Sequence, residues 1–333
     1  MKNLFTKHHL CLLATCLLFS TSSAVFANDS AGYVATGGVS YIKNPNISMH
    51  SEDLLISKDI IRVNYQYKNL SNQEIRENIL FPLPKVDSFI DSDYADVEQL
   101  YRSFKIWANG QPIKPTIHVR TFMYPVKNGE RAYPENGEAS IDTTALFQAC
   151  GISDSEMMRP WTQRDKVNTV SQKLLKCNNA ELKKLLLADD GESDTPWQSQ
   201  IIYSWQQPFK ANSITTVKHE YQPLVGGSVG TSEDELQKHC ADNDLRKRLK
   251  RFNESGSPFY NMPYNSLSYI LTTANNWAKP IQDFKLTVQR DAGELVSLCW
   301  DGKVQKINQN TFEMREQNFT PKRDLDVIFI RTK

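Results

Sequence analysis

Residues 226–230, read as GGSVG, match G-x-S-x-G, the pattern that surrounds the nucleophilic serine of many hydrolases. In such enzymes a tight turn between a buried strand and a helix exposes the serine, and a histidine accepts its proton. A strand-like run precedes the stretch and a helical run follows it, as the motif requires. Ser228 is therefore the candidate nucleophile.

Two features of the flanking sequence argue against catalysis by Ser228. The preceding run alternates polar and apolar residues and contains Pro223, which is typical of an antiparallel strand and not of a buried parallel one. The acidic residues at 233–235 begin the next helix and would repel an oxyanion. The sequence favours a structural hinge instead, formed by Gly226, Gly227 and Gly230.

A catalytic base or a metal ligand would have to come from scattered histidines. Only His239 follows Ser228, about three helical turns further along the chain. His118 or His219 could act as the base only if the fold brought one of them close. The histidines form no closely spaced pair and the chain has no Cys-x-x-Cys motif, so we expect no metal and no cofactor.

Tryptophan side chains could form a platform for a carbohydrate ligand. Most are expected in the core, because β-sandwiches fill their interior with such residues. The candidates are Trp107, Trp161, Trp205, Trp277 and Trp300.

The first 27 residues have the pattern of a secretory signal peptide. Two lysines precede an apolar run at 10–19, and small residues at positions 25 and 27 fit cleavage after Ala27. We therefore expect an exported protein, in the periplasm or outside the cell. A retained anchor and lipid attachment at Cys16 are the alternatives.

The charge of the mature chain excludes some classes of partner. Removal of the two signal lysines takes the formal charge from +1 to −1, which gives no bulk attraction to nucleic acid or to anionic lipid. The basic run at 246–251 is interpreted as the solvated end of a helix. No second apolar run is long enough to cross a membrane.

Four cysteines remain after cleavage, and an even number in an exported chain predicts two disulfides. Three pairings are possible. We favour Cys150 with Cys177 and Cys240 with Cys299, because each bond then closes a loop within one region of the chain.

Alternating runs predict strands over most of the chain. Residues 61–67 place Ile61 and Tyr65 on one face, and Asn109 with Gly110 predicts a tight hairpin. The runs at 200–209 and 213–225 are expected to pair as another hairpin. Residues 141–190 are helical and interrupt the strands, and one amphipathic helix is expected from a capping box at 232–235 onward.

The predicted fold is mainly β, with two antiparallel β-sandwich-like domains. The first, residues 28–225, contains the helical insertion at about 141–190. The second, residues 226–333, combines the amphipathic helix with an antiparallel sheet.

Several segments carry a resemblance to a known family. ILFPLP, HEYQPLVGGSVG, YILTTANNWAKPIQDFKLTV and NFTPKRDLDV together resemble a bacterial family of exported proteins, the domain of unknown function DUF4424. The resemblance implies bacterial origin and export and carries no catalytic residues. The strand before FPLP, with FKIWANGQPIKP and TTVKHEYQPL, also resembles the VIT β-sandwich of vault and inter-alpha-trypsin proteins, which implies a role in assembly.

These observations favour a non-catalytic interaction or binding module of the cell envelope, whose partner is an envelope protein or a glycan. A serine hydrolase that uses Ser228 and an envelope carbohydrate-binding protein are the alternatives.

Overall fold

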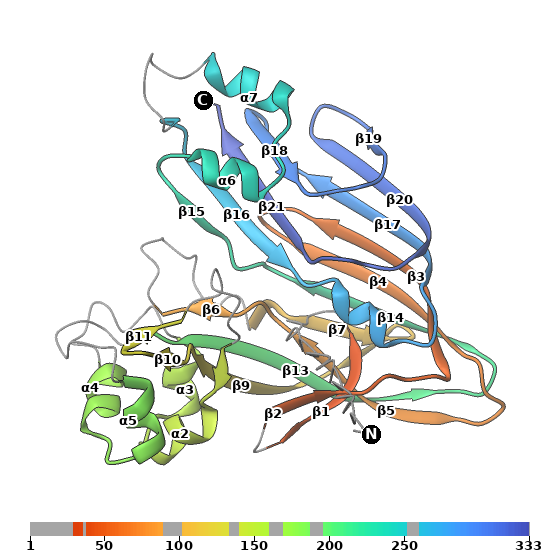
Figure 1. Ribbon diagram of the computed structural model, residues 1–333. Coiled ribbons are helices and arrows are strands. Elements are labelled where there is room, and N and C mark those ends of the chain that lie inside the picture. The colour runs from red at the N-terminus through yellow and green to blue at the C-terminus, as the bar shows by residue number, and fades with distance from the viewer. Residues whose placement is uncertain are drawn as a thin grey trace, which may run out of the picture.

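The computed structural model describes residues 29–35, 38–88, 102–132, 140–159, 169–186, 196–251 and 260–332. The predicted signal peptide and Trp161 lie outside these residues. The protein is mainly β, as predicted, and the strands of the described residues form three sheets and a two-stranded ribbon (Figure 1). Within the described ranges, no helix combines the length and the apolar character needed to cross a membrane.

The longest sheet has eight strands in the order β19-β20-β17-β3-β4-β14-β7-β8. Neighbouring strands are antiparallel except β3 and β17, which pair in parallel. Their bounds are β3 (Ile47–Ile56), β4 (Ile61–Asn69), β7 (Lys105–Ala108), β8 (Gln111–Ile113), β14 (Ile214–Tyr221), β17 (Ile281–Gln289), β19 (Val304–Lys306) and β20 (Thr311–Phe319).

Two further sheets and a ribbon complete the β-structure. A seven-stranded sheet has the order β12-β9-β13-β5-β1-β2, with β6 also paired to β13, and a four-stranded sheet has the order β15-β16-β21-β18. The bounds in the first are β1 (Ser30–Ala35), β2 (Gly38–Tyr41), β5 (Ile75–Pro82), β6 (Val86–Asp87), β9 (Thr116–Met123), β12 (Ile141–Asp142) and β13 (Gln198–Phe209). Those in the second are β15 (Gly226–Ser228), β16 (Tyr264–Tyr269), β18 (Glu294–Leu298) and β21 (Leu325–Arg331), and the ribbon joins β10 (Val126–Lys127) to β11 (Glu130–Arg131).

One hydrophobic core joins the three sheets. It contains Tyr65 of the eight-stranded sheet, Phe81 of the seven-stranded sheet and Phe329 of the four-stranded sheet, all at most 1% exposed. The alternation in β4 is as predicted, with Ile61, Val63 and Tyr65 buried and Arg62 and Asn64 on the opposite face. The inner face of the eight-stranded sheet thus packs against the other two sheets, and its polar outer face meets solvent.

The helical insertion has a core of its own. Helices α2 (Thr144–Ala149), α3 (Asp154–Met157), α4 (Thr169–Lys176) and α5 (Ala180–Leu186) gather beside β9–β11 at one end of the molecule (Figure 1). Phe147, Leu174 and Leu182 are fully buried there. The Cys150–Cys177 disulfide ties α2 to the end of α4, in the pairing favoured from the sequence.

The prediction of a single amphipathic helix after Ser232 is wrong in detail, because the chain forms two short helices. Helix α6 (Glu233–Lys238) ends before Cys240, which has a positive φ of 52°. The Asp242 side chain then accepts a hydrogen bond from the Leu245 amide and begins α7 (Asn243–Lys250). Both helices cover the four-stranded sheet, and the second favoured disulfide joins Cys240 to Cys299 (Figure 1).

The prediction that residues 200–209 and 213–225 pair as a hairpin is also wrong. Strand β13 pairs with β5 and β9, whereas β14 pairs with β4 and β7 in the other sheet. The chain therefore crosses the core between the two strands. Alternation identifies the buried face of a strand but does not identify the strand to which its backbone bonds.

The predicted domain boundary at residue 225 falls between β14 and β15. The eight-stranded sheet contains strands from both sides of this position, since β17 lies between β3 and β20. The division into two domains stays a prediction. A short 3-10 helix (Thr272–Asn276) links β16 to β17.

Candidate functional site

A hollow of about 580 Å³ lies on the outer face of the eight-stranded sheet. One row of side chains crosses it from strand to strand, because consecutive members occupy paired positions in the sheet. The row consists of Trp107, Lys218, Asn64, Asp53, Lys285 and Arg315, from β7, β14, β4, β3, β17 and β20.

A second row lies two residues further along the strands, and it consists of Thr216, Gln66, Ser51 and Asp283. A β-bulge at His50 brings Ser51 into this row. Met49 faces Tyr67 inside the core, and Ser51 faces Gln66, so the extra residue changes the side of the sheet that the strand presents. Without the bulge, Ser51 and Asp53 would point into the core.

The hairpin between β7 and β8 fixes one end of the hollow. Asn109 and Gly110 both have positive φ, of 48° and 79°, as the predicted two-residue turn requires. The side-chain oxygen Oδ1 of Asn109 accepts hydrogen bonds from the backbone amide and the hydroxyl of Thr216. Trp107 is partly exposed beside this turn, and the Lys218 ammonium lies 4.7 Å from the centre of its ring.

Each cation of the hollow lies beside an acid. Lys285 Nζ is 2.6 Å from a carboxylate oxygen of Asp53, and Lys218 Nζ is 3.1 Å from one of Glu220. A hydrogen bond from Arg62 and contacts with Lys218 hold the pKa of Glu220 below its usual value. The charges therefore come close to balance, and the face has no excess of one sign.

Three side chains in the middle of the hollow are available to a ligand. Ser51, Asn64 and Gln66 come from the adjacent strands β3 and β4, and they make no side-chain hydrogen bond within the ranges that the structure describes. Asn64 and Gln66 are exposed. Amide and hydroxyl groups can donate and accept hydrogen bonds, so the arrangement suits a polar ligand held at several points.

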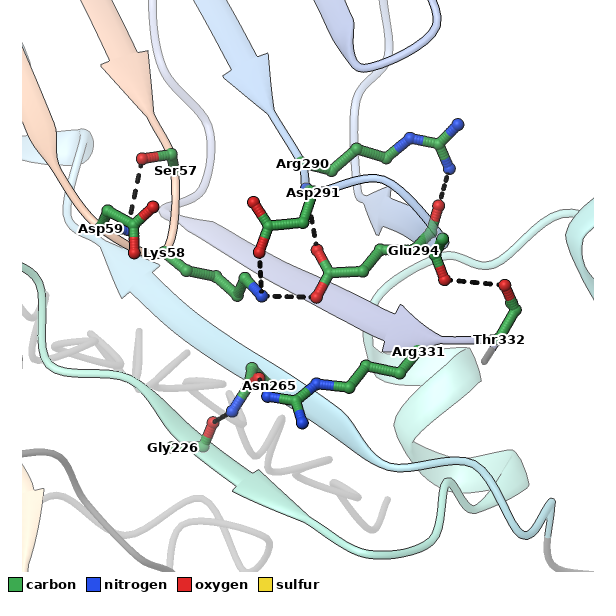
Figure 2. A network of polar contacts seen from close by, with 11 residues as sticks. Ser57, Lys58, Asp59, Gly226, Asn265, Arg290, Asp291, Glu294, Arg331 and Thr332 are labelled. Carbon is green, nitrogen blue, oxygen red and sulfur yellow. Dashed lines mark hydrogen bonds and ion pairs between the residues drawn. The ribbon is translucent and has the colours of Figure 1, made fainter.

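Ser228 lies elsewhere, at the end of the edge strand β15. This strand is antiparallel to β16, where Ser228 faces Tyr264, so it is not the parallel strand of a nucleophile elbow. The side chain is exposed and has no hydrogen-bond partner in the described part of the chain. Figure 2 shows the neighbouring Gly226, whose carbonyl lies 3.5 Å from the Asn265 side-chain amide.

The three histidines considered as its base have other partners. His118 Nε2 lies 2.8 Å from the Ser204 hydroxyl, and burial together with nearby Arg120 lowers the pKa of His118. His239 Nδ1 contacts the Glu235 carbonyl at 2.8 Å. His219 is fully buried within the core. Within the described residues, no hydrogen bond joins Ser228 to any of these three histidines.

One of the glycines beside Ser228 allows two backbone segments to lie close together. Gly226, Gly227 and Gly230 all lack the positive φ that would demand glycine. A Cβ atom added to Gly227, however, would lie 2.3 Å from the Tyr264 carbonyl oxygen. The interpretation of the three glycines as a hinge stays a prediction.

Of the tryptophans proposed as a platform that the structure describes, Trp107 is the one in the hollow. Trp205 and Trp277 are buried in the main core, as expected for a sandwich. Trp300 is partly buried against Phe284 and Phe319, beside a second hollow of about 300 Å³.

A family model described as a domain of unknown function, DUF4424, matches residues 27–328. The chain belongs to the DUF4424 family. No curated protein matches this DUF4424 chain.

Two solved structures show distant similarity to the DUF4424 chain. A candidate nutrient binding protein of Legionella pneumophila is 11% identical, and the match covers 91% of this chain and 70% of that one at a TM-score of 0.43. Native yeast LTA4 hydrolase is 8% identical, with 86% and 29% of the two chains covered and a TM-score of 0.25. Neither similarity is close enough to bear on function.

Sequence reasoning missed a buried polar cluster in this DUF4424 protein. Asp29 and His219 are fully buried, with His219 Nε2 3.1 Å from Asp29 Oδ1. Tyr67 donates a hydrogen bond to the same carboxylate, and Trp277 donates one to the Asp29 carbonyl. These groups are up to 248 residues apart in the sequence, so no local sequence pattern predicts the cluster.

In the described ranges, no three His, Cys, Asp or Glu side chains lie close enough together to hold a metal ion.

Proposed function

We propose that this DUF4424 protein is a non-catalytic binding module of the periplasm or the cell surface, which holds its ligand on the outer face of the eight-stranded sheet. The observation that carries the proposal is the group of three unengaged side chains, Ser51, Asn64 and Gln66, between Trp107 and a set of paired charges. Clefts that combine an aromatic surface with a few convergent polar groups are typical of binding sites.

Export is supported by two independent features. The first 27 residues have the order of a signal peptide, and both predicted cysteine pairs lie at bonding distance. Disulfides persist in oxidising compartments, such as the periplasm and the extracellular space. The ligand is therefore a component of the envelope or of its surroundings.

A photo-cross-linking experiment tests the position of the site. A benzoylphenylalanine residue is placed at Gln66, and in a matched control at Gln206, an exposed glutamine on the other large sheet. After irradiation of cells that export the protein, we expect an adduct from position 66 and none from position 206. Equal adducts from both positions, or none from position 66, would exclude the outer face as the binding surface.

Hydrolysis through Ser228 is tested by labelling with a fluorophosphonate probe. We expect no labelling that the Ser228→Ala substitution removes, because the serine lacks a base in the described structure. Stoichiometric, Ser228-dependent labelling would establish a hydrolase instead.

A further inference from the structure

We infer that the ligand of the outer face is a linear oligosaccharide that lies across the strands, from Trp107 towards Arg315; this inference rests on the proposed function. The row from β7 to β20 crosses six neighbouring strands. Adjacent strands are about 4.8 Å apart, so the row extends over roughly 24 Å. A pyranose unit in a β-linked chain has nearly the length of one strand spacing. A sugar chain in this direction would therefore place successive rings over successive strands.

The chemistry of the central side chains fits sugar hydroxyls. A hydroxyl both donates and accepts hydrogen bonds. The side-chain amides of Asn64 and Gln66 can likewise donate through their nitrogen and accept through their oxygen. They lie on paired strands with Asp53 and Ser51, so four hydrogen-bonding groups from β3 and β4 meet in the middle of the hollow. Trp107 at one end is partly exposed, with the Lys218 ammonium 4.7 Å from its ring centre, and its exposed ring surface is of the kind on which the apolar face of a pyranose stacks.

An extended peptide is a poorer match to the same surface. Peptides that add to sheets bond to the free backbone groups of an edge strand. Strands β14, β4, β3 and β17 each pair with a neighbour on both sides, so their backbone groups are used within the sheet. Recognition in the hollow therefore depends on side chains, which favours a ligand with its own dense hydrogen-bonding groups.

A polyanion or a lipid is also a poorer match. Lys285, Lys218 and Arg315 each form an ion pair with an adjacent acid, so little positive charge is left for phosphates. Among the lining side chains that point outward, Trp107 is the large apolar one, whereas the apolar Val217 is turned into the core. The face thus lacks both the net charge and the apolar area that those ligands require.

Calorimetric titration with β-1,4-linked N-acetylglucosamine oligomers, from the monosaccharide to the hexasaccharide, tests the inference on the full mature chain. We expect affinity to rise with each added sugar until the oligomer spans the row, and then to level off. Gln66→Ala should weaken binding about tenfold, as the loss of one or two hydrogen bonds would. Trp107→Ala should weaken it at least as much.

The control variant is Gln206→Ala, which changes an exposed glutamine of the seven-stranded sheet and should leave affinity unchanged. A parallel titration with β-1,4-linked glucose oligomers tests whether the acetamido group matters, and binding of either series in the expected manner supports the inference. Thermal melting of each variant shows that a loss of binding is not a loss of folding.

Three results would overturn the inference: no binding of any oligomer, affinity independent of length, or equal losses in Gln66→Ala and Gln206→Ala. The proposed function fails separately. If oligomers do not bind while position 66 still forms its photo-adduct, the outer face is a binding surface with a different ligand. If the adduct is also absent, the proposed function is wrong as well.

Discussion

Gly227 shows a structural reason for one glycine of the G-x-S-x-G stretch. A side chain there would meet the Tyr264 backbone at 2.3 Å, whereas at Gly230 the nearest atom would be 3.5 Å away. We expect Gly227→Ala to lower the free energy of unfolding by about 2 kcal/mol, because β15 and β16 would have to separate. Urea unfolding measures the change. Gly230→Ala is the matched control, and a loss there as large as at Gly227 would contradict this explanation.

Asp29 is the residue on which the buried polar cluster depends. Its carboxylate faces His219 and Tyr67, and all three side chains are at most 1% exposed. Asp29→Ala should lower the free energy of unfolding by about 3 kcal/mol, because it leaves buried polar partners unsatisfied. Asp59→Ala, at an exposed turn, is the control and should have little effect. Chemical denaturation that gives equal midpoints for the two variants would be evidence against the cluster's role.

The outward side chains of the candidate site could be predicted only in part. The alternation of residues 61–67 already separates Asn64 and Gln66 from the buried Tyr65. Their positions opposite Asp53 and Ser51 depend on the bulge at His50, which leaves no clear sequence signal. Trp107 and Lys285 join them only through strand pairings between distant segments, so the site as a whole could not be derived from local patterns.

At the scale of elements, local features were predicted better than long-range ones. The hairpin at Asn109 forms because two adjacent residues adopt positive φ, which is a local property. Strands β13 and β14 were both identified by their alternation, yet they belong to different sheets. Edge-to-edge pairing is decided by the packing of the whole core and not by the short connection between two strands.

Lys58 joins two elements, the turn between β3 and β4 and the turn between β17 and β18 (Figure 2). Its ammonium lies 2.5 Å from Glu294 and 2.9 Å from Asp291, and the Glu294 side chain is 3% exposed. Lys58→Met should cost about 3 kcal/mol of stability, because the Glu294 carboxylate would stay buried without its cation. Lys247→Met, which breaks an exposed ion pair, is the control and should cost no measurable stability.

The pH dependence of this ion pair gives a second readout. Burial alone would lower the pKa of Lys58, but hydrogen bonds and attraction from Glu294 and Asp291 outweigh it and raise the pKa above its usual 10.5. A raised pKa means that the stabilisation is complete below the unfolded value and is lost as the pH rises through the folded one. The difference between wild type and Lys58→Met should therefore persist at neutral pH and shrink above about pH 10.5; a difference that vanishes near pH 7 would contradict this.

At the scale of the whole molecule, the shared eight-stranded sheet bears on the predicted two-domain division. A fragment of residues 28–225 lacks β17 and β20, so one side of β3 would lose its hydrogen-bonding partner. It would also lose the core residues Phe284 and Phe329. We expect this fragment to show no cooperative thermal transition and poor dispersion of its amide signals. A fragment that unfolds cooperatively would confirm residues 28–225 as an independent domain.

The central claim is that the outer face of the eight-stranded sheet binds a ligand, and the indole N–H signal of Trp107 tests it most directly. Trp107→Phe assigns the signal in a nitrogen-15 correlation spectrum. On addition of the N-acetylglucosamine hexasaccharide, we expect this signal to shift in a saturable manner, while the signals of the buried Trp205 and Trp277 stay in place. Saturable binding that moves the Trp300 signal and leaves Trp107 unchanged would contradict the account, because it would place the ligand in the other hollow.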